Sequence, residues 1–167
     1  MDYPLVSVIM PVRNEAKHIA IGLGSIAKQT YPRHKVEIIV ADGMSDDDTR
    51  SVVHRIASEL SLNVHLLDNP KRIAPSGLNA ALDRSKGDII IRVDGHCELA
   101  PDYVANCVAL LKANRADGVG GPIETVGNGP VSEAIAIAMT TRFGVGGSAF
   151  RTVEDREIYT DTVAFPG

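Results

Sequence analysis

The sequence predicts an α/β fold with a mostly parallel central sheet and helices on both of its faces. Short β-branched apolar runs alternate with segments whose apolar residues recur at helical spacing. Parallel strands need long crossover connections, which the helical segments supply. The 167 residues are enough for one domain that buries its own core.

Each expected strand is a short run rich in valine and isoleucine that stops at a turn residue. The first run, 6–10, ends at Pro11, and the second, 36–40, is closed by Asp42 and Gly43. Further strands are expected over 63–67, 89–93 and 119–123.

Between these strands, apolar residues recur every three or four positions, which is typical of one buried helix face. Helices are expected from Ile19, after Ser45, from Pro75, from Pro101 and over 131–141. Ser45 and Asp48 resemble a capping box for the second helix, and Asp46 to Asp48 suit its positive N-terminal dipole. In the last three helices, the residues expected to face the core are Leu78, Ala81 and Leu82; Val104, Cys107, Val108 and Leu111; and Ile135, Ala138 and Met139.

The composition favours a soluble globular protein and disfavours nucleic acid as a partner. Apolar residues make up 44% and charged residues 23% of the chain, as in ordinary globular domains. The net charge of −4 and the absence of tryptophan argue against a basic or base-stacking surface. The two cysteines form no zinc or disulfide pattern, and neither a signal peptide nor a membrane-length apolar run is visible, so a cytoplasmic location is expected.

Polar residues follow three of the expected strands. Ligands of parallel α/β sheets bind beyond the carboxyl ends of the strands. This rule brings residues 11–15, Asp42 and residues 94–96 to one edge of the sheet. The first turn has no glycine and the chain has no Walker A sequence, so a glycine cradle for phosphate is not expected. A metal ion is the natural substitute.

The segment Asp94-Gly95-His96 carries the strongest chemical signal. A carboxylate and an imidazole two residues apart at a strand end can converge on one ligand. They could hold a divalent cation, or a ribose hydroxyl together with a cation. The alternative is a simple turn, because Asp-Gly is a common turn dipeptide.

Four segments together resemble the motifs of GT-A-fold glycosyltransferases of family 2, in the family's order. They are residues 8–15, 40–46, 69–81 and 87–96, the last resembling the family's Asp-x-Asp strand with His96 in place of the second Asp. The details are most similar to bacterial enzymes of succinoglycan and other exopolysaccharide biosynthesis. The resemblance implies a Rossmann-like nucleotide-diphospho-sugar transferase fold. Residues 1–125 would form the nucleotide-sugar-binding domain and residues 126–167 the start of an incomplete acceptor-side region.

The resemblance also implies residue roles. The donor-site residues would be Pro11, Val12, Arg13, Asn14 and Glu15 around uridine and ribose, Asp42 on the uracil ring, Lys71 or Arg72 on the base or a phosphate, Asp94 on ribose or metal, and His96 at the metal position. Other interpretations stay open. Asn14 and Glu15 could only cap the first helix, Asp42 could be a turn residue, and Lys71 and Arg72 could be a solvated pair.

The expected reaction is an inverting, metal-dependent transfer in exopolysaccharide biosynthesis. The donor would be a UDP-sugar such as UDP-glucose, and the acceptor a saccharide or lipid-linked saccharide. Mn²⁺ or Mg²⁺ would be the cofactor, although imidazole suits Mn²⁺ better than Mg²⁺. The family's general base is an Asp expected beyond Gly167, so residues 1–167 are expected to bind donor without transferring sugar, and any membrane association would come from later residues. The alternative is a non-catalytic nucleotide-binding or regulatory α/β domain.

Overall fold

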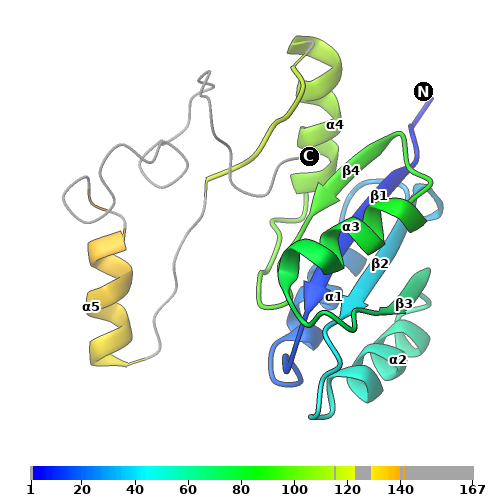
Figure 1. The fold of residues 1–167 in the computed structure, drawn as a ribbon. Helices are drawn as coiled ribbons and strands as arrows, with labels where there is room; N and C mark the ends of the chain where they lie inside the picture. Colours follow the sequence, from blue (N-terminus) through cyan, green and yellow to red (C-terminus); the bar gives the residue numbers. More distant parts are fainter. Residues whose placement is uncertain (1, 115, 123–128, 140, 142–167) are drawn as a thin grey trace.

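The computed structural model describes residues 2–114, 116–122, 129–139 and 141, and it confirms the parallel sheet (Figure 1). Four strands lie in the order β3-β2-β1-β4, and every pair is parallel. Central β1 pairs Val6 with Val36 of β2 on one side and with Ile89 of β4 on the other. The strands span Val6–Val12 (β1), Val36–Asp42 (β2), Val64–Asp68 (β3) and Ile89–Arg92 (β4).

Helices cover both faces of the sheet, as the alternating pattern predicts. One face packs against α1, α2 and α4 in a large core that includes Met10, Leu23 and Val104. On the other face, α3 packs over Ile9 and Ile39 in a smaller core (Figure 1). The helices span Ile19–Ala27 (α1), Thr49–Glu59 (α2), Ala74–Arg84 (α3), Tyr103–Asn114 (α4) and Pro130–Met139 (α5), with a short 3₁₀ helix at Arg33–Lys35.

The strand order places a topological switch between β1 and β4. The chain moves outward from β1 to β2 and β3, and then returns to the opposite side of β1 to form β4. In open parallel sheets, ligands bind in the crevice beyond the carboxyl ends of the strands at such a point. The turns that follow β1 and β4 are therefore the first place to look for a site.

Some expected elements differ from the structure. Residues 119–122 form no strand. Leu82 was expected in the core but is 43% exposed, because α3 faces the sheet through Gly77 and Ala81 and a helix turns by about 100° per residue. In α5 the prediction of Ile135 as a core residue is also wrong, since Ile135 is 56% exposed while neighbouring Ala136 is buried.

The expected capping box is absent as well. Asp48 is the residue before α2, but its side chain makes no capping hydrogen bond. Asp47 accepts instead from the Thr49 backbone N–H at 3.0 Å. The Ser45 hydroxyl donates to Asp42 rather than to the helix. A carboxylate one residue earlier therefore takes the capping role, and Ser45 is free to organise the turn after β2.

The domain boundary expected at residue 125 lies outside the described residues, as does most of the acceptor-side region expected over 126–167. Among the helices that the structure does describe, none combines the length and apolarity needed to cross a membrane.

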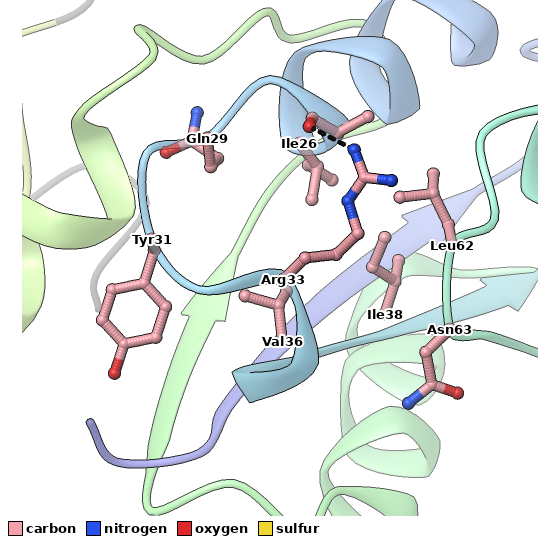
Figure 2. A pocket seen from close by; sticks show the side chains of 9 residues that line it. Ile26, Gln29, Tyr31, Arg33, Val36, Ile38, Leu62 and Asn63 are labelled. Carbon is pink, nitrogen blue, oxygen red and sulfur yellow. Dashed lines mark hydrogen bonds between the residues drawn. The ribbon is translucent and has the colours of Figure 1, made fainter. Parts of the chain in front are cut away.

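A small cavity lies at the amino end of β2, far from the carboxyl ends of the strands (Figure 2). Its volume is about 20 Å³, enough for about one water molecule and too small for a nucleotide. Beside it, the Arg33 guanidinium donates to the carbonyls of Ala27 and Leu60, both at 3.1 Å. These bonds satisfy carbonyls at the ends of α1 and α2, so the cavity belongs to the structural framework rather than to a ligand site.

Candidate functional site

The turns beyond the carboxyl ends of the four strands meet along one edge, which we call the carboxyl rim (residues 12–16, 42–47, 68–72 and 92–97). The Gly43 N–H donates to the Val12 carbonyl at 2.7 Å, and the Asn69 N–H donates to the Asp42 carbonyl at 2.8 Å. Backbone hydrogen bonds thus continue from strand to turn. The structure therefore brings together the segments that the strand-end rule predicted.

Asn14 cross-links the first two turns. Its backbone has a φ of 55°, a conformation that asparagine adopts more readily than most residues. Its N–H donates to Ser45 Oγ at 2.9 Å, and its side-chain oxygen accepts from the Asp46 N–H at 3.1 Å. Helix α1 is preceded by His18. The Asn14 side chain therefore ties the turn after β1 to the turn after β2 and does not cap α1.

The carboxylate of Asp42 is buried and accepts three hydrogen bonds. It accepts from the Ser45 hydroxyl, from the Ser45 N–H at 3.1 Å and from Arg50 Nη1 at 2.9 Å, with none of the Asp42 side chain exposed. Arg50 also pairs with Asp68 at 2.8 Å, and the hydrogen bonds to Asp42 and then Asp68 raise the pKa of Arg50. A contact between Asp42 and uracil stays a prediction, and it requires neighbouring groups to move because none of the Asp42 side chain is exposed.

Arg50 and Asp68 were not anticipated as rim residues. Asp68 could have been found, because it is the last residue of the third strand and the strand-end rule applies to it as well. Arg50 gives no such signal, since it lies in the first turn of a helix and its position depends on how α2 docks. Together they form an ion-pair bridge between the ends of β2 and β3.

The turn after β4 pairs its two polar side chains with neighbours. Arg92 contacts Asp94 at 3.1 Å, and His96 Nδ1 lies 3.1 Å from Glu15 Oε1. Gly95 makes the second contact feasible, because a Cβ there would lie 2.9 Å from Val12 and 3.2 Å from Glu15. The turns after β1 and β4 are therefore packed against each other at the topological switch.

Lys71 and Arg72 are exposed on the turn between β3 and α3. Arg72 has a φ of 58°, and its N–H donates to the Asn69 carbonyl at 3.0 Å. The buried Asn69 side chain fixes the turn by donating to the Ile73 carbonyl and accepting from the Ser76 hydroxyl. The backbone of this turn is thus held by hydrogen bonds, while the charged side chains of Lys71 and Arg72 are exposed at the rim.

The residues at the rim fit a divalent cation that binds together with a phosphate. In the part of the chain that the structure describes, no three His, Cys, Asp or Glu side chains form a metal cage. Asp94 and His96 supply one oxygen donor group and one nitrogen donor group. Mg²⁺ is commonly held by one or two carboxylates plus substrate phosphates, and imidazole suits transition metals better than Mg²⁺. The donor set therefore suits a metal completed by a diphosphate.

The cysteines add no nucleophile. Burial and then the nearby Asp94 charge raise the pKa of the Cys97 thiol. Burial raises the pKa of Cys107 to about 11. Both thiols therefore stay protonated at neutral pH, and only a thiolate would act as a nucleophile or metal ligand.

Comparison with known proteins identifies the family. Residues 7–163 match the family described as Glycosyl transferase family 2. The chain belongs to this family. It is 35% identical over 147 residues to the succinoglycan biosynthesis protein ExoA of Rhizobium meliloti (strain 1021), covering 87% of this chain and 44% of that protein. The chain thus spans less than half the length of this relative.

Solved glycosyltransferase structures share the fold, which is the GT-A fold. The mannosyltransferase PcManGT from Pyrobaculum calidifontis, solved with GDP-Man and Mn²⁺, is 35% identical with a TM-score of 0.63, over 77% of this chain and 37% of that one. S. aureus TarS 1–349, solved with UDP, is 25% identical with a TM-score of 0.66, over 75% of this chain and 38% of that one. These comparisons indicate a nucleotide-sugar transferase role for the family. They do not identify the donor sugar or the metal ion of this chain.

Proposed function

We propose that this chain forms the donor-binding part of an inverting, metal-dependent glycosyltransferase that uses a UDP-sugar, with UDP-glucose as the first candidate. The acceptor would be a saccharide or lipid-linked saccharide in exopolysaccharide biosynthesis. The relative from succinoglycan biosynthesis supports this pathway class. We propose a cytoplasmic location, at the inner face of the plasma membrane where the acceptor is lipid-linked.

The observation that carries the proposal is the packing of the turns after β1 and β4 at the topological switch. Glu15 and His96 meet there across 81 residues of sequence at 3.1 Å, with Asp94 two residues from His96. Nucleotides bind at such a switch in open parallel sheets. A solved relative carries Mn²⁺ together with its sugar nucleotide, which supports a metal in this family.

In this proposal, the residues divide between nucleoside and diphosphate. Pro11 to Glu15 would line uridine and ribose, and Lys71 or Arg72 would reach the base or a phosphate. Asp94 and His96 would hold the cation, which when bound supplies positive charge to the departing diphosphate. In an inverting transfer, a base takes the proton of the acceptor hydroxyl as that oxygen attacks the anomeric carbon.

Calorimetric titration of UDP, GDP and ADP with Mn²⁺ and with chelator tests the proposal. We expect UDP to bind best, and about 5–150-fold more tightly with Mn²⁺ than without it. His96→Ala should remove the metal effect while keeping the metal-free affinity, whereas His54→Ala, on the exposed side of α2, should change neither. Equal UDP affinity with and without metal would contradict the metal role. GDP binding better than UDP would contradict the donor.

We further propose that residues 1–167 alone bind donor but transfer no sugar. The family's base is expected downstream of Gly167, and loss of general-base assistance typically costs about 10²–10⁴ in rate. A radiolabelled transfer assay comparing residues 1–167 with a longer chain tests this. Robust transfer by residues 1–167 would contradict it, and Glu154 and Asp155 would then be the first residues to replace.

A further inference from the structure

Glu15 holds the imidazole of His96 from one side. Its Oε1 lies 3.1 Å from His96 Nδ1, and the two residues come from turns that follow different strands. An ionised carboxylate only accepts hydrogen bonds, and a neutral imidazole donates from one nitrogen and accepts at the other. In a neutral His96 this contact favours the proton on Nδ1, which leaves the lone pair on Nε2.

The Glu15 backbone is fixed independently of His96. Its N–H donates to Thr49 Oγ1 at 2.8 Å, and Thr49 is fully buried. Its carbonyl accepts from the N–H groups of His18 and Ile19, both at 2.9 Å. Hydrogen bonds on both sides thus set where the Glu15 side chain begins, so the carboxylate is presented to His96 by a rigid turn.

The loop that carries His96 is fixed just as closely. A Cβ on Gly22 of α1 would lie 3.2 Å from the carbonyl oxygens of both Gly95 and Cys97. The Cys97 N–H donates to the Asp94 carbonyl at 3.0 Å and closes the turn. Helix α1 therefore packs directly against the backbone of this turn. The Glu15–His96 contact thus joins two turns whose backbones are already fixed.

We propose that Glu15 is a positioning residue that holds His96 in the Nδ1–H tautomer and so presents Nε2 to the divalent cation. This inference rests on the metal role of Asp94 and His96 in the proposed function.

His18 provides a matched control. Its Nδ1 lies 3.4 Å from Glu15 Oε2, so the same carboxylate faces two imidazoles. The His18 side chain is 57% exposed and that of His96 is 59% exposed. The two histidines thus share a partner and a level of exposure, but only His96 lies in the turn after β4.

The test combines imidazole tautomers with metal affinity. Long-range ¹H–¹⁵N spectra in mildly alkaline buffer should show the Nδ1–H form for His96 in the wild type and in Glu15→Gln, whose side-chain oxygen still accepts. Glu15→Ala should shift His96 toward a tautomer mixture. Titration of Mn²⁺ in the presence of UDP, followed by water-proton relaxation, should show about 10–100-fold weaker binding in Glu15→Ala and a smaller loss in Glu15→Gln. His18→Ala should match the wild type in both measurements.

The outcomes separate this inference from the proposed function. A wild-type His96 in the Nε2–H form overturns the inference, as does a Mn²⁺ affinity that Glu15→Ala leaves unchanged. A His18→Ala variant as weak as Glu15→Ala also overturns it, because the effect would then be general to the Glu15 region. If the wild type binds UDP equally tightly with and without Mn²⁺, the proposed metal site itself is overturned, whichever tautomer His96 adopts.

Discussion

Glu37→Gln is expected to destabilise the fold in a pH-dependent way. Glu37 lies in β2 and is only 4% exposed, although it carries a charge. Its Oε1 accepts from the Ser7 hydroxyl and from the Lys86 N–H at 2.7 Å, and the Gly87 N–H donates to Ser7 Oγ at 2.7 Å. The Glu37 carboxylate therefore joins β1, β2 and the chain entering β4 at the amino end of the sheet.

The sign of the pH dependence follows from the pKa of Glu37. Burial raises this pKa, but the hydrogen bonds from Ser7 and the Lys86 N–H outweigh burial and leave it below the usual range. The unfolded chain therefore binds the proton more tightly than the folded protein. The stabilisation is complete above the unfolded pKa of about 4.3 and is lost as the pH falls through the lower folded pKa. Hydrogen bonds to a charged group contribute about 1.5–3 kcal/mol, which sets the expected loss at neutral pH.

Urea unfolding followed by circular dichroism measures this loss. At neutral pH the free energy of unfolding of the wild type should exceed that of Glu37→Gln by about 1.5–3 kcal/mol. This difference should shrink steadily below pH ~4. Glu59→Gln is the control, because Glu59 forms an exposed ion pair with Arg55 on α2, and losing that pair should cost less than about 0.5 kcal/mol. A gap between wild type and Glu37→Gln that stays constant from neutral pH to about pH 3 would refute the reasoning.

Three further substitutions test the rim and the core. Gly95→Ala places a methyl group 2.9 Å from Val12, so it should lower the free energy of unfolding by about 1–3 kcal/mol. It should also weaken the Mn²⁺-linked binding of UDP in calorimetry. Arg50→Ala leaves the fully buried Asp42 carboxylate with Ser45 as its remaining side-chain partner, and should lower the free energy of unfolding by about 1–3 kcal/mol; an unchanged urea midpoint would contradict this. Leu82→Ala should cost less than about 1.5 kcal/mol in the same assay, against about 2–5 for a buried leucine, because Leu82 is 43% exposed.

The sheet could be predicted from the sequence because its strands are buried on both faces. Such strands are continuous β-branched runs, and all four were expected within two residues of their observed ends. Helix faces were predicted less well. The burial of Leu82 depends on which residues of α3 meet β1 and β2, and the small residues Gly77 and Ala81 occupy that line. Apolar spacing alone does not reveal that a helix docks through its smallest side chains.

The rim could be located from the sequence, but its pairing could not. Parallel strands all end at one edge, so the convergence of Glu15, Asp42 and His96 follows from topology. Which of them stays accessible depends on side chains that arrive from elsewhere. Arg50, from the first turn of α2, encloses Asp42, whereas the carboxylate that meets His96 leaves that imidazole 59% exposed. Asp42, the last residue of β2, is thus enclosed by its partners, whereas the imidazole of His96, in the turn after β4, keeps an exposed surface.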